Sequence, residues 1–330
     1  MPVLLSGHPD PVAAFDAAHA AGRRVAVRTS GTSAGRPRTL VRTTASWVDS
    51  FAPVAGRLGL GSTDRLWIPG PLDATMNLFA ACVARSVGAS WGSDAAGATW
   101  AQLTPTGLAT LLDDGPPPAA SLRGVLVAGD GLGHRLSARA GAAGLEVHHY
   151  YGAAELSLVA WGTSAADLHL FDQVEAQVRN GVLWVRSPWL SDGPAPGSPA
   201  GAWQRDADGF ATVDDHTTLA GTHVRVLGRP GWVTTGGSTV ALAPVAAALS
   251  AHTTAPVRLV GVPHAALGHV LTAVVATSDD LAAARRWARA HLAGAERPRR
   301  WLVHPRPPTT PAGKVDPVAL AHWAAAEVAR

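Results

Sequence analysis

The chain has 330 residues, 47% of them hydrophobic, so it is long enough for about two folded domains with apolar cores. Its formal net charge is only +3 and its basic residues are scattered, which argues against a nucleic-acid-binding protein. The single cysteine, Cys82, excludes a disulfide framework and a cysteine metal site, and its apolar neighbours predict a buried thiol.

No apolar run reaches the roughly 18 to 20 residues that span a bilayer. The first ten residues, MPVLLSGHPD, lack the basic segment and the long apolar stretch of a signal peptide. We therefore expect a soluble, cytoplasmic protein without a membrane span. A homo-oligomer is compatible with the sequence.

Strand-like and helical patterns alternate through the first 150 residues. Such alternation is typical of an α/β architecture. We expect helices at 45–58, at 74–87 and from about 132, and strands at 23–29, 38–44, 65–69, 123–128 and 145–149.

Two hairpins are predicted next. Asn180-Gly181 and Asp208-Gly209 each stand between alternating runs, and both dipeptides favour a type I′ turn. After Gly228 the pattern returns to α/β, with strands expected at 258–262 and 270–277 and a helix at 281–292. We therefore expect two domains, residues 1–229 and a smaller one at residues 230–330.

The loop between the first two predicted strands, 30–38, is rich in glycine and hydroxyl groups that can surround a phosphate chain. It is not a Walker A loop, because only three residues separate Gly31 from Gly35 and no lysine follows. Gly31 to Gly35 (GTSAG) also matches the nucleophile elbow of serine hydrolases around Ser33. That elbow must open a helix, whereas Pro37 and the run after it favour a strand, so the hydrolase is an alternative interpretation.

Lys314 is the only lysine in the chain; every other Lys or Arg position is arginine. An ammonium group is a compact point charge that fits a tight cluster of oxygen atoms, whereas guanidinium is a wide planar fork. The one position that keeps lysine is therefore a candidate functional residue.

Five motifs in order resemble those of the adenylate-forming enzymes. The loop TSGTSAGRPR at 29–38 resembles their phosphate loop, and the most specific match is PTTPAGKVD at 308–316, which contains Lys314. The other three are AGDG at 128–131, YYGAAE at 150–155 and TVD at 212–214, with Gly228-Arg229 following at the usual distance.

The resemblance extends from about Arg23 to the end of the chain, without the family's usual opening subdomain. It implies an α/β adenylate-forming fold with a truncated large N-terminal α/β domain and a small mobile C-terminal α+β domain. The layout is most similar to the short o-succinylbenzoate–CoA ligases, followed by other acyl-CoA ligases. The N-terminal domain would bind ATP and the acid, and the C-terminal domain would be a lid that carries the catalytic lysine.

The resemblance also implies residue roles. Tyr151 would stack on adenine and Glu155 would hold Mg²⁺, while Asp214 and Arg229 would bind the ribose. Lys314 would stabilise the charge that builds on the α-phosphate, with Glu155 as the second catalytic residue. The other nucleotide-binding positions would be Thr29, Ser30, Gly31, Thr32, Ser33, Gly35, Arg38, Gly129, Asp130 and Gly152.

The implied reaction has two halves. A carboxylic acid reacts with ATP to give an acyl-adenylate and pyrophosphate, and coenzyme A then takes the acyl group and releases AMP. Between the halves the C-terminal domain rotates, which brings the loop with Gly236 and Gly237 to the thiol tunnel. The acid pocket is expected near 72–79 and 90–91, flanked by Gly152 and Ala153.

Several positions depart from the family pattern. Arg38 replaces the phosphate-loop lysine, Ala154 replaces a threonine, and Pro230 stands where the hinge is expected. These departures leave a third interpretation open, a degenerate protein that binds nucleotide without turnover.

Overall fold

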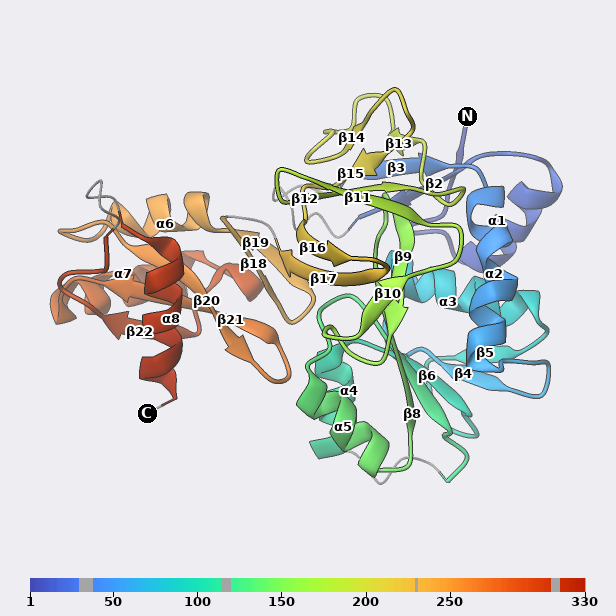
Figure 1. Cartoon of the computed structure of the whole chain (residues 1–330), viewed down its shortest axis with the longest axis horizontal. Coiled ribbons are helices and arrows are strands. Elements are labelled where there is room, and N and C mark those ends of the chain that lie inside the picture. Colours follow the sequence, from blue (N-terminus) through green and yellow to red (C-terminus); the bar gives the residue numbers. More distant parts are fainter. Residues whose placement is uncertain (30–37, 114–119, 229–230, 310–314, 330) are drawn as a thin grey trace. The chain divides into compact units, whose positions relative to one another are not determined.

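The computed structural model describes residues 1–29, 38–113, 120–228, 231–309 and 315–329. The chain divides into two compact units, Met1–Leu227 and Gly228–Arg330, and Figure 1 shows the elements of each. The roles expected of the two domains stay predictions. Within the described ranges, no helix combines the length and the apolar character that crossing a membrane requires.

The first unit is built on a long sheet whose first half is parallel. Its strands lie in the order β5-β4-β6-β7-β8, and every pair among them is parallel. Their bounds are β4 (Arg65–Trp67), β5 (Ser90–Gly92), β6 (Trp100–Leu103), β7 (Gly124–Val127) and β8 (Glu146–Ala153).

From β8 onward the sheet becomes antiparallel, beginning with the β8–β9 pair. The order continues β9-β10-β17-β16-β12-β15-β14, and β11 pairs with β12. These strands are β9 (Ser157–Gly162), β10 (Leu168–Leu170), β11 (Glu175–Arg179), β12 (Val182–Arg186), β14 (Gln204–Arg205), β15 (Ala211–Thr212), β16 (His216–Ala220) and β17 (His223–Gly228). A second sheet has the order β1-β2-β3-β13 and comprises β1 (Val3–Leu4), β2 (Val25–Arg28), β3 (Thr39–Arg42) and β13 (Gly193–Pro194).

Helices cover the parallel strands in two groups (Figure 1). One group is α1 (Pro11–Ala20), α2 (Ala45–Leu58) and α3 (Thr75–Ser86); the other is α4 (Pro105–Asp113) and α5 (His134–Ala142). Phe15, Trp47, Phe51 and Phe79 join the first group through ring contacts of 5.6 to 6.0 Å. This aromatic cluster belongs to the main core, and two of its members, Trp47 and Phe79, line the pocket described below.

The predicted turn at Asn180-Gly181 is confirmed, since both residues have the positive φ (53° and 81°) of a type I′ turn. The second hairpin is confirmed, since β14 and β15 pair antiparallel, but the type I′ turn predicted at Asp208-Gly209 is wrong, because only Gly209 has a positive φ. The Asp206 carboxylate instead accepts a hydrogen bond from the Phe210 amide at 2.8 Å and closes a longer loop.

Two other differences bear on function. The strand predicted to end at 149 runs on to Ala153, with an irregularity in its pairing between Tyr151 and Gly152. The residues before Arg23 also belong to the fold, since they form β1 and α1. Helices α2 and α3 lie where the sequence predicted them.

The second unit is a five-stranded sheet covered on both faces. Side chains alternate along β20, so Leu259 faces a cluster with α6 and α7 while Val260 faces one with α8. The elements are β18 (Trp232–Thr235), β19 (Ser238–Ala241), β20 (Arg258–His264), β21 (Gly268–Val275), β22 (Arg300–Val303), α6 (Leu242–Ser250), α7 (Ser278–His291) and α8 (Pro317–Val328).

Candidate functional site

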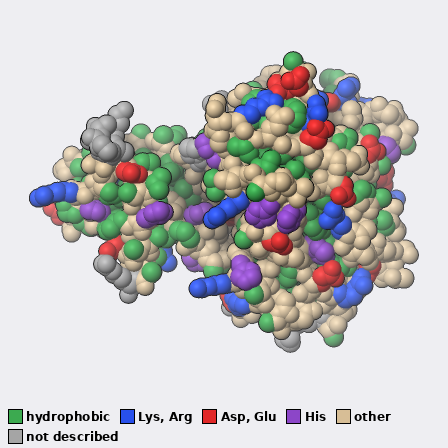
Figure 2. Space-filling model, viewed as in Figure 1, with side chains coloured by type: hydrophobic (Ala, Val, Ile, Leu, Met, Phe, Trp, Pro, Cys, Tyr) green, Lys and Arg blue, Asp and Glu red, His purple; other side chains and the backbone are tan. Residues whose placement is uncertain are grey.

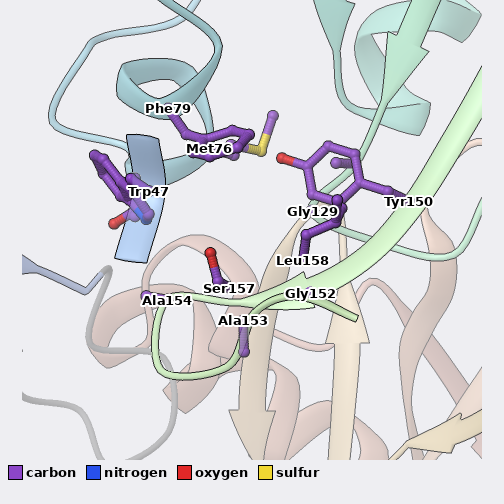
Figure 3. Close-up of a pocket in the computed structure, with 12 residues that line it drawn as sticks. Trp47, Met76, Phe79, Gly129, Tyr150, Gly152, Ala153, Ala154, Ser157 and Leu158 are labelled. Carbon is purple, nitrogen blue, oxygen red and sulfur yellow. The ribbon is translucent and has the colours of Figure 1, made fainter. Parts of the chain in front are cut away.

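A pocket lies in the first unit where β7 and β8 end and α3 begins (Figure 3). Ligands in α/β sheets bind outside the carboxyl ends of parallel strands, so the place fits a substrate site. The empty space in and in front of the pocket is about 490 Å³, which includes open solvent at its mouth. Its lining comprises Trp47, Thr75, Met76, Phe79, Ala128, Gly129, Tyr150, Gly152, Ala153, Ala154, Ser157 and Leu158.

The residues predicted to surround the acid line this pocket in part, and its binding of an acid stays a prediction. Residues from 72–79 line it together with Gly152 and Ala153, as expected, but Ser90 and Trp91 do not. Gly129 sits at its rim with φ +87°, and a β-carbon there would come within 3.0 Å of the Met76 sulfur. Glycine at this position therefore serves both the turn after β7 and the space for Met76.

Beside the pocket, the predicted adenine-stacking residue is held in place by a hydrogen bond. The Tyr151 hydroxyl donates to Asp215 Oδ2 at 2.6 Å, and Tyr151 is half-buried. Asp214, the predicted ribose ligand, is exposed and has φ +67°, and its amide donates to Thr212 Oγ1. Of the two neighbouring aspartates, Asp215 is the one joined to Tyr151.

Arg38 and Glu155, predicted for phosphate and metal binding, meet in a buried ion pair. Arg38 Nη2 lies 2.8 Å from Glu155 Oε1, and both side chains are about 5% exposed. The Ala200 carbonyl accepts from Arg38 Nη1 at 2.9 Å, and a β-carbon at Gly201 would collide with the guanidinium. The segment around Ala200 thus covers the pair and excludes water from it.

Glu155 is the one residue of this pair that could hold Mg²⁺. Within the described ranges, no three His, Cys, Asp or Glu side chains gather into a metal site. Magnesium is commonly held by one or two carboxylates together with nucleotide phosphates, so a single Glu155 is sufficient in number. Because Glu155 Oε1 already pairs with Arg38, the ion would have to share or replace that contact.

A second buried arginine, which the sequence analysis did not identify, supports the pocket wall. Arg42 is 0% exposed and donates to the Ala154 and Trp189 carbonyls at 3.3 Å and to Ser157 Oγ at 3.5 Å. Its guanidinium also lies over the Trp47 ring at 4.8 Å. Burial lowers the pKa of Arg42 to about 9, and the charges of Asp192 and Glu155 oppose that shift.

The loop after β7, the predicted adenine segment, is held by His149. Its Nδ1 bonds the Val127 carbonyl at 2.9 Å, and its Nε2 lies 3.5 Å from the Leu132 amide, on the two sides of Gly129-Asp130. Burial lowers the pKa of His149 to about 4, so the ring stays neutral and can accept at Nε2.

Several predicted residues lie outside the described residues: Ser30, Gly31, Thr32, Ser33, Gly35, Pro37, Arg229, Pro230 and Lys314. The residues that flank the segment 30–37 and the segment 310–314 are described. Arg38 and Thr29 exchange hydrogen bonds across the base of the first, where β2 pairs antiparallel with β3. The segment therefore joins two strands and not a strand to a helix, which is the wrong setting for the hydrolase elbow at Ser33.

In the second unit, Thr309 and Val315 pair across the base of the segment that contains Lys314. Asp316, next to it, accepts hydrogen bonds from Val318 and Ala319 and caps the N-terminus of α8. The last residue of the GKVD motif therefore has a structural role. Gly236 and Gly237 form the tight turn between β18 and β19, with φ of 55° and 80°.

Four residues at the site were not predicted from the sequence as functional: Arg42, His149, Tyr150 and Ser157. Tyr150 could have been predicted from the sequence. The YYG motif contains two adjacent tyrosines, which must face opposite sides of a strand. On the face shown in Figure 2, basic and acidic side chains are interspersed, without a continuous basic stripe among the described residues.

Comparisons with known proteins agree with this geometry. No protein-family model matches the chain. The uncharacterized acyl–CoA ligase YhfT of Bacillus subtilis is 23% identical over 329 residues, which cover 89% of this chain and 67% of that protein.

Two solved structures are similar in fold. The amide bond synthetase McbA of Marinactinospora thermotolerans has a TM-score of 0.71 and 23% identity, covering 91% of this chain and 69% of its own. The o-succinylbenzoate–CoA synthetase MenE of Bacillus subtilis, a double mutant bound with a product analogue, has a TM-score of 0.69 and 21% identity, covering 90% and 69%. The predicted α/β fold and the resemblance to adenylate-forming enzymes are therefore confirmed, and the chain spans about 69% of the length of these two structures.

Proposed function

We propose that the protein is an ATP-dependent ligase that activates a carboxylic acid as its acyl-adenylate and passes the acyl group to coenzyme A. The observation that carries the proposal is the meeting of three predicted segments at one cavity. Residues from 75–79, 128–129 and 152–154 line the same pocket, and Tyr151 with its partner Asp215 adjoins it. A protein that only bound nucleotide would have no use for a second, largely apolar pocket next to the tyrosine.

The residues divide into a nucleotide part and an acid part. Tyr151, oriented through its hydroxyl by Asp215, offers its ring to adenine, while the loop held by His149 borders the base. Glu155 would hold Mg²⁺, which neutralises phosphate charge when bound, and Arg38 adds a fixed positive charge beside it. Lys314 would stabilise the charge that develops as the acid carboxylate attacks the α-phosphorus and pyrophosphate leaves.

Two classes of acceptor compete for the second half-reaction. Coenzyme A is supported by the names of YhfT and MenE, which are an acyl–CoA ligase and a CoA synthetase. McbA is an amide bond synthetase, so an amine is the competing acceptor. Both acceptors follow the same adenylation step, which can therefore be tested first.

Pyrophosphate exchange into ATP, measured against a panel of carboxylic acids, tests the first half-reaction. The panel contains benzoates, o-succinylbenzoate and short and long fatty acids. Exchange with one acid, reduced at least about 100-fold in Lys314→Ala, would support adenylation. Adding coenzyme A or a primary amine to the reactive acid, with thioester and amide products counted by mass, then identifies the acceptor.

The matched control is Lys314→Arg, which keeps the charge but replaces a point charge with a planar fork. We expect it to lose most of the exchange while ATP binding persists. Measurable ATP binding with no exchange for any acid in the wild-type protein would contradict the proposed ligase and favour the nucleotide-binding alternative.

A further inference from the structure

We infer that the acid is a flat, mostly apolar monocarboxylate that carries one neutral hydrogen-bond acceptor on its body, recognised by the hydroxyls of Tyr150 and Ser157. The inference rests on the proposed function, since it names the substrate class of the same pocket. It assigns a specificity role to two residues that the nucleotide chemistry does not use.

The shape of the pocket favours a flat acid. In Figure 3, Trp47, Phe79 and Met76 lie on one side and the backbone of Gly152 to Ala154 lies on the other. Aromatic and thioether side chains contact aromatic rings favourably, and the small residues opposite let a planar group approach the backbone. A slot of this kind suits an aryl ring better than a branched chain.

Ser157 provides the first donor. Its backbone has φ +60°, an uncommon conformation for a residue other than glycine, and its oxygen is turned into the pocket (Figure 3). Arg42 Nη1 donates to this oxygen at 3.5 Å. Accepting from Arg42 occupies one of the two lone pairs of this oxygen, so its proton remains available for an acceptor in the cavity.

Tyr150 provides the second donor. Its ring stacks on Trp161 with centroids 6.1 Å apart, and its hydroxyl points into the pocket near Met76 (Figure 3). No hydrogen bond to this hydroxyl is found within the part of the chain that the structure describes. Burial raises the pKa of Tyr150 above its ordinary value, so the hydroxyl stays a neutral donor.

The charges around the pocket favour a neutral acceptor. Among the described residues, no lining side chain is an arginine, lysine or histidine. Arg42, directly behind the wall, is directed at the Ala154 and Trp189 carbonyls and at Ser157, and Asp192 and Glu155 lie near it. A second carboxylate buried here would lack a direct cationic partner, whereas a carbonyl or ether oxygen needs only the two hydroxyls.

Three benzoates of similar shape test the inference: 4-acetylbenzoate with a neutral acceptor, 4-isopropylbenzoate with none, and terephthalate with a second carboxylate. The 3-substituted series and o-succinylbenzoate are measured alongside. We expect 4- or 3-acetylbenzoate to exceed its isopropyl partner at least about tenfold in kcat/KM for adenylation, and to exceed the dicarboxylates by more. Binding of the same acids is measured by isothermal titration calorimetry without ATP.

Two variants locate the donors. Tyr150→Phe and Ser157→Ala each remove one hydroxyl, and each should lower the acetyl-to-isopropyl ratio at least about threefold while leaving the isopropyl acid bound. Tyr151→Phe is the control: its hydroxyl is committed to Asp215, so it should change the KM for ATP but not the acid ratio.

The outcomes separate the two proposals. A calorimetric preference for the acetyl acids without any pyrophosphate exchange would support the recognition and refute the ligase. Exchange that favours an isopropyl acid or a dicarboxylate, or a ratio unchanged in both variants, would overturn the inference while the ligase stands. Absence of both binding and exchange would refute both.

Discussion

Tyr150 and Tyr151 are neighbours on β8 and serve two regions of opposite character. Tyr151 belongs to a polar region in which the side chains are already paired: its hydroxyl bonds Asp215, and nearby in the chain Glu155 pairs with Arg38. Tyr150 belongs to an apolar pocket and presents its hydroxyl to open space. Because side chains alternate along a strand, a step of a single residue separates the region expected to bind nucleotide from the one expected to select the acid.

Polar groups that are already hydrogen-bonded within the protein and donors that await a partner from the substrate suit different functions. A region that binds a common nucleotide can keep its polar groups in fixed internal bonds that orient an aromatic ring. A region that discriminates among acids needs a donor whose partner is the substrate, since leaving that donor unsatisfied penalises the wrong acid. Each prediction below perturbs one side of this contrast, beginning with the largest effect.

Breaking the buried pair in the polar region should have the largest effect on stability. Arg38→Met leaves the Glu155 carboxylate buried without its counter-charge, so we expect the free energy of unfolding to fall by about 3 to 5 kcal/mol. Urea titration of Arg38→Met, Glu155→Gln and the double variant measures this. The double variant should be less destabilised than the sum of the two, and strict additivity would show that the pair does not form in solution.

The loop after β7, which borders both regions, depends on a neutral histidine, so the protein should lose stability in acid. The folded protein lowers the pKa of His149 to about 4, below the ordinary value of 6.5. Between these values the unfolded chain binds the proton and the folded chain does not, so His149 lowers stability as pH falls from 6.5 towards 4. The stabilisation present above pH 6.5 and lost by pH 4 is about 3 kcal/mol.

His149→Gln removes this titration while keeping an acceptor and a donor near the loop after β7. The difference in unfolding free energy between wild type and variant should therefore shrink as the pH falls from 7 to 4. A difference that stays constant over that range would show that His149 is accessible to protons in the folded state.

The sequence predicted the parts of this contrast that come from local pattern. Helix α2 has an apolar stripe and is capped at its C-terminus by Gly59, whose φ of 57° suits glycine, so the helix and its C-terminal end were predictable. Strand β8 was predicted too short because Gly152 resembles a strand-breaking residue, whereas it lies at an irregularity that lets the strand continue. Helix α1 was missed because its alanine-rich sequence carries little amphipathic signal.

The contacts that define the site join residues far apart in the chain, and no local pattern reports them. Arg38 and Glu155 were predicted separately, for phosphate and for metal, and only the fold brings them together. The resemblance pointed to Asp214, whereas the fold directs the neighbouring Asp215 at Tyr151, and no local pattern distinguishes the two. The positive φ of Ser157 has no signal in its residue type.

A smaller effect is expected when the paired tyrosine loses its hydroxyl. Tyr151→Phe removes the bond to Asp215 but keeps the ring, so we expect the KM for ATP in pyrophosphate exchange to rise by about three- to tenfold. The rate at saturating ATP should change little, because the hydroxyl orients the ring and takes no part in the chemistry. An unchanged KM for ATP would contradict a nucleotide role for Tyr151.

The smallest effect is expected for an ion pair in the open, and it sharpens what burial contributes to the polar region. Arg139 Nη2 lies 2.5 Å from Asp113 Oδ1, a shorter contact than that between Arg38 and Glu155, but both side chains are about half exposed. Water and salt screen such a pair, so Arg139→Met should change the free energy of unfolding by less than about 0.5 kcal/mol. The same urea titration in low and high salt measures it against Arg38→Met. A loss as large as that of Arg38→Met would mean that contact distance, and not exclusion of water, sets the strength of these pairs, and the contrast between a sealed polar region and an open pocket would lose its physical basis.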